Sequence, residues 1–409
     1  MNRIILIGNG FDLAHGLKTS YADFVYWYWK RRVTMLYDVR SNTSDDTLCS
    51  LEIIGESWAI YYFQHSLSIK NADGKDLYQY LNKHKDKFVI RHTAFFGNIH
   101  KSIETKGWVD IENEYYKLLE HFSIENYSEK EIENLNNQLR YLQELLTEYL
   151  TAINQQDIPF IENIRKKIYA PIKSSDIAIE ATQTLTEYIE LCNKQGNEVW
   201  DVKFAHYGIN AITTGETHDV DKFKKDPSLC SMYPRVYMLP ERIMLLNFNY
   251  TKTAIPYLKQ NTDIFSLNQI HGVLELPESM IFGFGDEFED RYKKLQNIGD
   301  NKCLSNIKTI RYQESDNYRQ VLAFIESAPF QVCIMGHSCG NSDRTLLNTI
   351  FEHRNCISIK PYYYQKEGGT DSYIETVQNI SRNFTDMKLM RDRVVNKQFC
   401  ETLTGEYKL

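Results

Sequence analysis

This 409-residue chain lacks the cysteine patterns of a structural metal site or a redox pair. Its eight cysteines form no C-x-x-C pair, and no Cys/His cluster has the spacing of a zinc site. They are scattered along the chain, at Cys49, Cys192, Cys230, Cys303, Cys333, Cys339, Cys356 and Cys400. We therefore expect reduced thiols and no bound metal.

Long apolar runs and an excess of positive charge are missing too. The first apolar run, Ile4–Ile7, stops at Gly8, which is too short for a signal-peptide core or a membrane span. We therefore expect a cytoplasmic protein that does not enter a membrane. Lys and Arg number 47 against 54 Asp and Glu, for a net charge of -7. Because the nucleic-acid backbone requires concentrated positive charge, nucleic acid is not expected as the main partner.

Proline and glycine are few, at 9 and 19, and no internal repeat or low-complexity segment occurs. That argues against solenoid and disordered classes, and it leaves domain borders weakly marked. The 42% hydrophobic and 25% charged composition is typical of a folded globular protein.

Short β-type runs separated by helix-length segments dominate both ends of the chain. Ile4–Ile7 is typical of a buried central strand, and Thr19 and Ser20 offer N-caps for a helix that begins near Tyr21. Further strands are predicted at Arg242–Leu246, Ile264–Leu267, Met280–Phe282, Gln331–Met335 and Ile357–Ile359. This alternation predicts an α/β fold with a doubly wound, mainly parallel sheet.

The middle of the chain has helical periodicity instead. A capping box at Ser128–Glu131 precedes apolar residues at helical spacing from Ile132 to Ile153, and Ile177–Leu191 has the same character. We therefore predict a core formed by residues 1–95 and 235–409, interrupted by a mainly helical insert over residues 96–234.

A glycine-containing loop, Gly8-Asn9-Gly10, follows the first strand. Glycines let backbone N–H groups approach an anion, so the loop has the chemistry of a phosphate-binding turn. Leu13 stands where the G-x-G-x-x-G fingerprint requires its last glycine, so a plain tight turn stays open as the alternative.

Four motifs together resemble the sirtuin pattern, in the same order along the chain. Gly8, Gly10 and Gly16 match its G-A-G-x-S-x-x-S-G-I segment, and Asn247-Phe248-Asn249-Tyr250 follows a strand as the sirtuin T-Q-N-x segment does. Ile270-His271-Gly272 is similar to its catalytic x-H-G, and Met335-Gly336-His337-Ser338 to its G-T-S.

The chain also resembles the AbiH family of bacterial phage abortive-infection proteins. The resemblance rests on segments 7–21, Trp108–Glu112, Asn247–Thr251 and the glycine-rich run from Gly336 to Asp343. It covers nearly the whole chain and implies a role in defence against phage.

Two departures from the sirtuin pattern limit what the resemblance implies. Thr251 stands where sirtuins carry an acid, and Asp12 where they carry Ser. The four-cysteine zinc ribbon is also missing. The resemblance therefore implies NAD hydrolysis with nicotinamide release rather than protein deacylation, with NAD or a related nucleotide as substrate and no bound prosthetic group.

The resemblance also implies roles for individual residues. His271 would be the catalytic base, and Asn249 would hold water or ribose beside the glycosidic carbon. The remaining nucleotide-binding candidates are Gly8, Asn9, Gly10, Phe11, Asp12, His15, Gly16, Asn247, Tyr250, Gly336, His337, Ser338 and Asp343. Structural alternatives stay open: His271 as a plain hydrogen-bonder, Asn249 as the cap of a helix near Thr251, and Asp343 as the cap of the next helix.

Two other functions stay open. Gly336-x-Ser338-x-Gly340 also matches the nucleophile elbow of serine hydrolases, with His353 as the only histidine further along the chain. A non-catalytic nucleotide sensor in phage defence is the other alternative. For an NAD-consuming effector we further expect restraint by a phage-derived trigger or by assembly into a homo-oligomer.

Overall fold

The computed structural model describes residues 1–39, 41–55, 61, 71–195, 238–258, 265–288, 290–366 and 368–405. The chain divides into two compact units. Unit 1 comprises Met1–Leu17, Asp157–Met280 and Thr309–Leu409, and unit 2 comprises Lys18–Gln156 and Ile281–Lys308.

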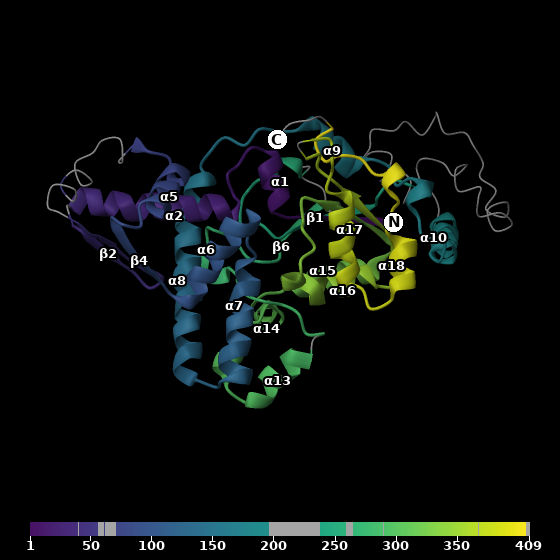
Figure 1. The fold of residues 1–409 in the computed structure, drawn as a ribbon. Helices are drawn as coiled ribbons and strands as arrows, with labels where there is room; N and C mark the ends of the chain where they lie inside the picture. Colours follow the sequence, from purple (N-terminus) through teal and green to yellow (C-terminus); the bar gives the residue numbers. More distant parts are fainter. Residues whose placement is uncertain are drawn as a thin grey trace. The chain divides into compact units, whose positions relative to one another are not determined.

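Unit 1 is built on a five-stranded sheet in which every neighbouring pair of strands is parallel (Figure 1). Its order across the sheet is β6-β5-β1-β7-β8. The strands are β1 (Asn2–Ile7), β5 (Arg242–Asn247), β6 (Phe265–Gln269), β7 (Phe330–Met335) and β8 (Cys356–Tyr362). The predicted parallel α/β fold is confirmed.

The strand order places β1 in the middle and reverses direction there. After β1 the chain adds β5 and β6 on one side and then returns to add β7 and β8 on the other. Counted within the sheet, this is the order 3-2-1-4-5 of doubly wound folds, whose ligands collect at the carboxyl ends of the strands where the order reverses. In the register, Ile7 lies beside Asn247, and Asn247 beside Gln269. The segments that follow these strands therefore emerge at one edge of the sheet.

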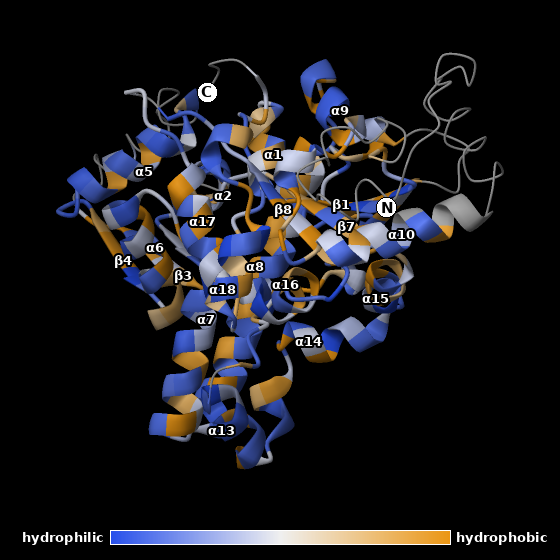
Figure 2. Ribbon diagram, turned by 90° about the vertical axis from the view of Figure 1, so that its right-hand side faces the viewer, coloured by the Kyte–Doolittle hydropathy of each residue, from blue (hydrophilic) through white to orange (hydrophobic). Residues whose placement is uncertain are grey.

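Both faces of this sheet are covered, which explains why β1, β7 and β8 are buried along their whole length (Figure 2). On one face Ile5 and Ile7 pack with Phe11 of α1 (Asn9–Ala14) and Ile164 of α9 (Glu162–Tyr169). On the other side lie α15 (Asn317–Ser327) and α16 (Arg344–Phe351) (Figures 1 and 2). The unit also holds α10 (Thr182–Gln195), α14 (Lys308–Arg311, which begins on the last residue of unit 2), α17 (Tyr373–Arg382) and α18 (Met387–Arg393).

Two sequence predictions for this region need correction. Met280–Phe282 forms no strand; its side chains are buried in a connecting segment, so the apolar run indicated burial rather than strand pairing. The helix predicted over Ile177–Leu191 begins only at Thr182, because the preceding backbone amides bind elsewhere. Ile179 N–H, for example, donates to Asp392. Ile264, at the start of the third predicted strand, lies outside the described residues.

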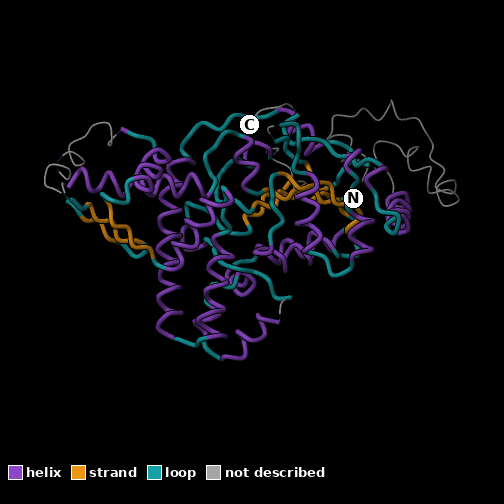
Figure 3. Tube along the Cα trace, in the orientation of Figure 1, coloured by secondary structure: helices purple, strands orange, loops and turns teal. Residues whose placement is uncertain are grey.

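Unit 2 combines helices with a small antiparallel sheet, one of the two groups of strands drawn in orange in Figure 3. Its strand order is β2-β3-β4. Its strands are β2 (Thr43–Asp45), β3 (Cys49–Ile53) and β4 (Phe88–His92). Its helices are α2 (Tyr21–Val39), α5 (Gly74–Lys83), α6 (Ala94–Lys106), α7 (Ile111–Glu120), α8 (Glu129–Ile153) and α13 (Asp290–Ile298). Ser128 Oγ accepts from Glu131 N–H at 3.4 Å, so the cap predicted for α8 is confirmed.

In the core of unit 2, hydrogen bonds link a series of aromatic side chains, each donating to the next. Trp29 Nε1 donates to His100 Nε2 at 2.9 Å, and His100 Nδ1 lies 3.0 Å from the Tyr78 hydroxyl. Because the indole N–H can only donate, His100 Nε2 must be unprotonated. The neutral ring therefore carries its proton on Nδ1. The Tyr78 hydroxyl in turn donates to Glu104 Oε1 at 2.9 Å. Burial, with the nearby His92 as a second cause, lowers the pKa of His100 to about 3.

The unit borders fall near residues 17, 156, 280 and 308. The division of the chain at residues 95 and 235 stays a prediction. Residues 196–237 lie outside the described part of the chain, so the helical insert over residues 96–234 stays a prediction. Among the helices that the structure describes, none has both the length and the apolar character needed to cross a bilayer.

Candidate functional site

The candidate site lies in unit 1, where four strands of the parallel sheet end. Gly8 follows β1, Asn247 is the last residue of β5, His271 comes two residues after β6, and Gly336 follows β7. Each predicted motif therefore follows a strand, and the sheet gathers their residues at one edge.

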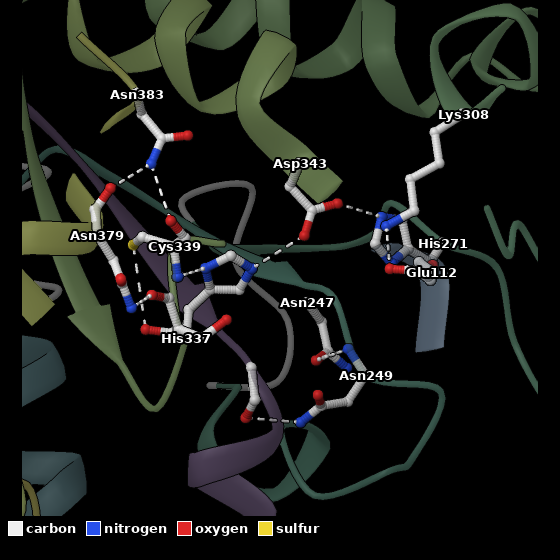
Figure 4. Close-up of polar contacts among 12 residues, drawn as sticks. Glu112, Asn247, Asn249, His271, Lys308, His337, Cys339, Asp343, Asn379 and Asn383 are labelled. Atoms are coloured by element: carbon white, nitrogen blue, oxygen red, sulfur yellow. Dashed lines mark hydrogen bonds and ion pairs between the residues drawn. The ribbon is translucent and has the colours of Figure 1, made fainter. Parts of the chain in front are cut away.

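A buried carboxylate lies between two buried imidazoles at this edge (Figure 4). Asp343 Oδ1 is 3.2 Å from His271 Nε2, and Asp343 Oδ2 is 3.6 Å from His337 Nε2. The three residues are 5% to 8% exposed. Each carboxylate oxygen of Asp343 therefore faces one imidazole nitrogen in a setting with little water.

The backbone determines which nitrogen of His337 carries the proton. Cys339 N–H donates to His337 Nδ1 at 3.0 Å, so this nitrogen is an acceptor. In the neutral ring the proton then resides on Nε2, the nitrogen that faces Asp343. The ring of Phe248, 4.0 Å away between centroids, covers one side of the imidazole.

Asp343 precedes α16 in the chain, but its side chain makes no capping hydrogen bond to that helix. The capping interpretation is therefore wrong, because the carboxylate turns to His271 and His337 instead. Tyr312 adds a further contact that the sequence did not indicate. Its hydroxyl lies 3.4 Å from His271 Nε2, and the two rings are nearly parallel.

The glycines of the first loop serve a close contact between two loops. Gly10 N–H donates to Gly336 O at 2.8 Å, and Phe11 N–H donates to Gly8 O at 2.9 Å. A Cβ on Gly8 would lie 2.6 Å from the Cα of His337, and one on Gly336 would lie 2.0 Å from the nitrogen of Phe11. The N–H groups of Gly10 and Phe11 are thus engaged within the protein.

Asp12 is buried beneath this loop and accepts a hydrogen bond from Thr251. Thr251 Oγ1 donates to Asp12 Oδ2 at 2.7 Å, and Thr253 Oγ1 donates to Thr251 Oγ1 at 3.2 Å. Asp12 Oδ1 is buried and has no hydrogen-bond partner within the described part of the chain. Burial raises the pKa of Asp12 to about 6, although the hydrogen bond from Thr251 opposes the shift.

Asn249 is tied to the first loop rather than to a helix. Its Nδ2 donates to Gly8 O at 2.9 Å, and its backbone N–H donates to Asn247 Oδ1 at 3.1 Å (Figure 4). No helix begins at Thr251; the chain turns there and forms only a short 3-10 helix at Ile255–Tyr257. The capping interpretation of Asn249 is therefore wrong. Its side chain lies beside Gly8, and its amide nitrogen binds the backbone there.

The other predicted site residues differ in their burial and in their contacts. His15 has both ring nitrogens occupied, by Phe11 O at 2.7 Å and by the Tyr257 hydroxyl at 2.6 Å. Gly16 lies two residues after the end of α1 and has a φ of +80°. Tyr250 is buried with its ring 6.5 Å from that of His271, and Asn9 is exposed.

The structure separates the two residues of the serine-hydrolase alternative. Ser338 is exposed just beyond the carboxyl end of β7, whereas His353 lies near Phe330, at the start of that strand, and its Nε2 is 3.2 Å from Glu326. Cys339 rather than Ser338 has the positive φ typical of a nucleophile elbow. His353 therefore cannot serve as the base for Ser338.

No group of three or more potential metal ligands occurs among the residues that the structure describes. The polar groups at this edge are two imidazoles beside a carboxylate, together with carboxamides and hydroxyls. This arrangement suits proton transfer and the binding of a polar organic molecule.

Comparison with known proteins gives one match. A family model described as bacteriophage abortive infection AbiH matches residues 4–364. The chain belongs to the AbiH family. No curated protein and no solved structure matches it. The AbiH match runs from within β1 to just after β8 and ends before α17, so it contains every predicted site residue.

In this AbiH protein, sequence patterns missed several residues that shape the site. Tyr312 contacts His271, and Asn379 and Asn383 contact the turn after β7. None of them directly follows a strand, and none belongs to a glycine-containing motif. Only the folding of the chain brings them to the sheet edge.

Proposed function

We propose that this antiphage abortive-infection protein of the AbiH family binds NAD at the carboxyl edge of its parallel sheet and hydrolyses it to nicotinamide and ADP-ribose. The AbiH match supplies the defence role. The resemblance of its strand-end motifs to those of sirtuins suggests NAD as the substrate.

The observation that carries the proposal is the pairing of His271 with Asp343. A general base needs a fixed orientation and a partner that stabilises its protonated form. Asp343 Oδ1, 3.2 Å from His271 Nε2, provides both. The pair lies at the edge where doubly wound sheets bind nucleotides.

In the proposed reaction, the bond between C1′ of the ribose and the nicotinamide nitrogen breaks. Its electron pair goes to the pyridinium nitrogen, which becomes neutral. The oxygen of a water molecule bonds to C1′, and the proton that it loses passes to the imidazole of His271 and then to solvent. Asn249, held by Gly8 O, would place this water with its carboxamide oxygen.

The proposed NAD pose takes account of N–H groups that the protein already uses. Gly10 and Phe11 donate to Gly336 and Gly8, so the diphosphate would lie toward the start of the loop, near Asn9. The exposed Ser338 hydroxyl would bind the ribose on the adenosine side.

One observation favours a non-catalytic nucleotide sensor instead. The amide groups of Asn249 and Asn247 donate to Gly8 O and Gln269 Oε1, so both side chains already have structural roles in this conformation. A sensor would bind NAD or a related nucleotide without cleaving it. In either case we propose that a phage-derived trigger or assembly into a homo-oligomer controls the protein.

The test uses the full-length protein with NAD and follows both nicotinamide release and NAD binding. We expect His271→Ala to reduce release by roughly 10²-fold to 10⁴-fold, the usual contribution of a general base. Asn249→Ala should also reduce it. His353→Ala is the matched control, because this histidine also faces a carboxylate but lies at the other end of β7.

Equal nicotinamide release by wild type, His271→Ala and Asn249→Ala would overturn the site. NAD binding by the wild type without release, with and without phage lysate, would favour the sensor.

A further inference from the structure

The turn that follows β7 has an uncommon backbone conformation at Cys339. Its φ is 54°, and it is the only non-glycine residue in the described part of the chain with a positive φ. L-residues seldom adopt this left-handed region, so surrounding contacts must hold it. The Cys339 side chain is fully buried, so the turn cannot move outward without exposing it to solvent.

Two asparagines at the end of α17 hold this turn by its carbonyl groups (Figure 4). Asn379 Nδ2 donates to Ser338 O at 2.8 Å, and Asn383 Nδ2 donates to Cys339 O at 2.9 Å. Asn383 Nδ2 also donates to Asn379 O at 2.8 Å. A reversed Asn383 amide would place its oxygen against two carbonyl oxygens, so the orientation is determined.

The conformation of this turn determines which ring nitrogen of His337 carries the proton. Its conformation directs Cys339 N–H to His337 Nδ1 at 3.0 Å, which leaves the proton on Nε2. That nitrogen faces Asp343, which also contacts His271. A chain of contacts therefore runs from α17 to the candidate base.

We propose that Asn379 and Asn383 are positioning residues that hold the His337 imidazole in its Nε2–H form against Asp343. Neither asparagine is required to touch a substrate. Both follow the segment matched by the AbiH model, which ends at residue 364. The effect on NAD turnover rests on the proposed function, whereas the effect on His337 does not.

A purely structural role would have a different signature. The Asn383 side chain also binds its own helix, because its Nδ2 donates to Asn379 O at 2.8 Å. If stabilising the end of α17 were its whole role, loss of the side chain would lower stability but leave the tautomer of His337 unchanged. The tautomer therefore distinguishes the two roles.

The experiment measures imidazole ¹⁵N chemical shifts in the full-length protein labelled at histidine, with His337→Gln used to assign the His337 signals. The variants are Asn379→Ala, Asn379→Asp and Asn383→Ala. Asn379→Asp retains the side-chain shape but cannot donate to Ser338 O. Asn355→Ala is the matched control, because Asn355 Nδ2 donates to Ile325 O at 2.9 Å, and Asn355 lies in the loop before β8.

We expect the wild type and Asn355→Ala to show an unprotonated Nδ1 and a protonated Nε2 at His337. Both Asn379 variants should lose this fixed pattern and show averaged shifts. Unchanged His337 shifts in both Asn379 variants, or the same loss in Asn355→Ala, would overturn the proposal. Because Asn379 is only half-buried, its variants decide the question if Asn383→Ala does not fold.

Nicotinamide release is measured on the same samples. If the wild type releases none, with and without phage lysate, while the His337 shifts respond as expected, the proposed function fails and the positioning role stands. If the wild type is active, we expect at least a 10-fold fall in kcat for the Asn379 variants and wild-type kcat for Asn355→Ala.

Discussion

Asp12 Oδ2 accepts a hydrogen bond from Thr251 Oγ1 at 2.7 Å, within an almost fully buried site. This contact ties α1 to the segment after β5, and it places a carboxyl group where water cannot solvate its charge. Burial raises the pKa of Asp12 to about 6, against the opposing hydrogen bond from Thr251. The pH dependence of stability should reveal this group.

Asp12 should make the protein less stable as pH rises from 3.8 to about 6. In this window the folded state binds more protons than the unfolded state, so rising pH favours unfolding. We expect the free energy of unfolding of the wild type, relative to Asp12→Asn, to fall by on the order of 3 kcal/mol across the window and then stay level. Urea unfolding at several pH values measures this. The exposed Asp157→Asn is the control, and a constant difference between wild type and Asp12→Asn would contradict the assignment.

His100 should make unit 2 sensitive to acid. Burial lowers its pKa from 6.5 to about 3, so between these values the unfolded state binds the extra proton. Stability should therefore fall as pH decreases through this window, by about 1.4 kcal/mol per pH unit. His100→Gln cannot titrate but can still bond to Trp29 and Tyr78, so it should lose less stability on acidification. The exposed His121→Gln should behave as the wild type does, and parallel curves for His100→Gln and wild type would refute the prediction.

Asp343 should matter for NAD turnover more than for NAD binding. Asp343→Asn keeps the shape of the side chain but removes the negative charge between His271 and His337. We expect nicotinamide release to fall by up to the roughly 10²-fold to 10⁴-fold contribution of a general base, with little change in the Kd for NAD. Asp392→Asn is the control, since Asp392 accepts from the backbone of Ile179 away from the site. An Asp343→Asn enzyme with wild-type kcat would exclude this role.

Gly336 and Gly16 allow backbone strain to be separated from steric overlap. Both have a φ near +80°, but a Cβ on Gly336 would lie 2.0 Å from Phe11 N, whereas one on Gly16 would meet no atom within 4 Å. Gly16→Ala should therefore cost only the strain of the left-handed conformation, about 1–2 kcal/mol. Gly336→Ala should cost about 1–3 kcal/mol more, because the two loops must separate. Urea midpoints provide the comparison, and equal costs would show that the loops do not need the close contact.

Several local features were predictable because they depend on neighbouring residues. The strand at Ile4–Ile7, the helix from Tyr21 and the cap at Ser128 follow from local patterns of burial and hydrogen bonding. Where a local pattern had two explanations, prediction failed. The apolar run Met280–Phe282 is buried without being a strand, and Asp343 precedes a helix without capping it.

The sequence by itself determined a parallel α/β core of the AbiH family and the positions of its strand-end motifs, because alternating apolar runs and glycine turns are local signals. Only the tertiary structure decided what those motifs contact. It placed Asp343 between two histidines and buried Asp12 against Thr251. It also brought Asn379 and Asn383 to the turn at Cys339. The physical reason is that burial and partner choice depend on residues distant in sequence, which no local pattern specifies.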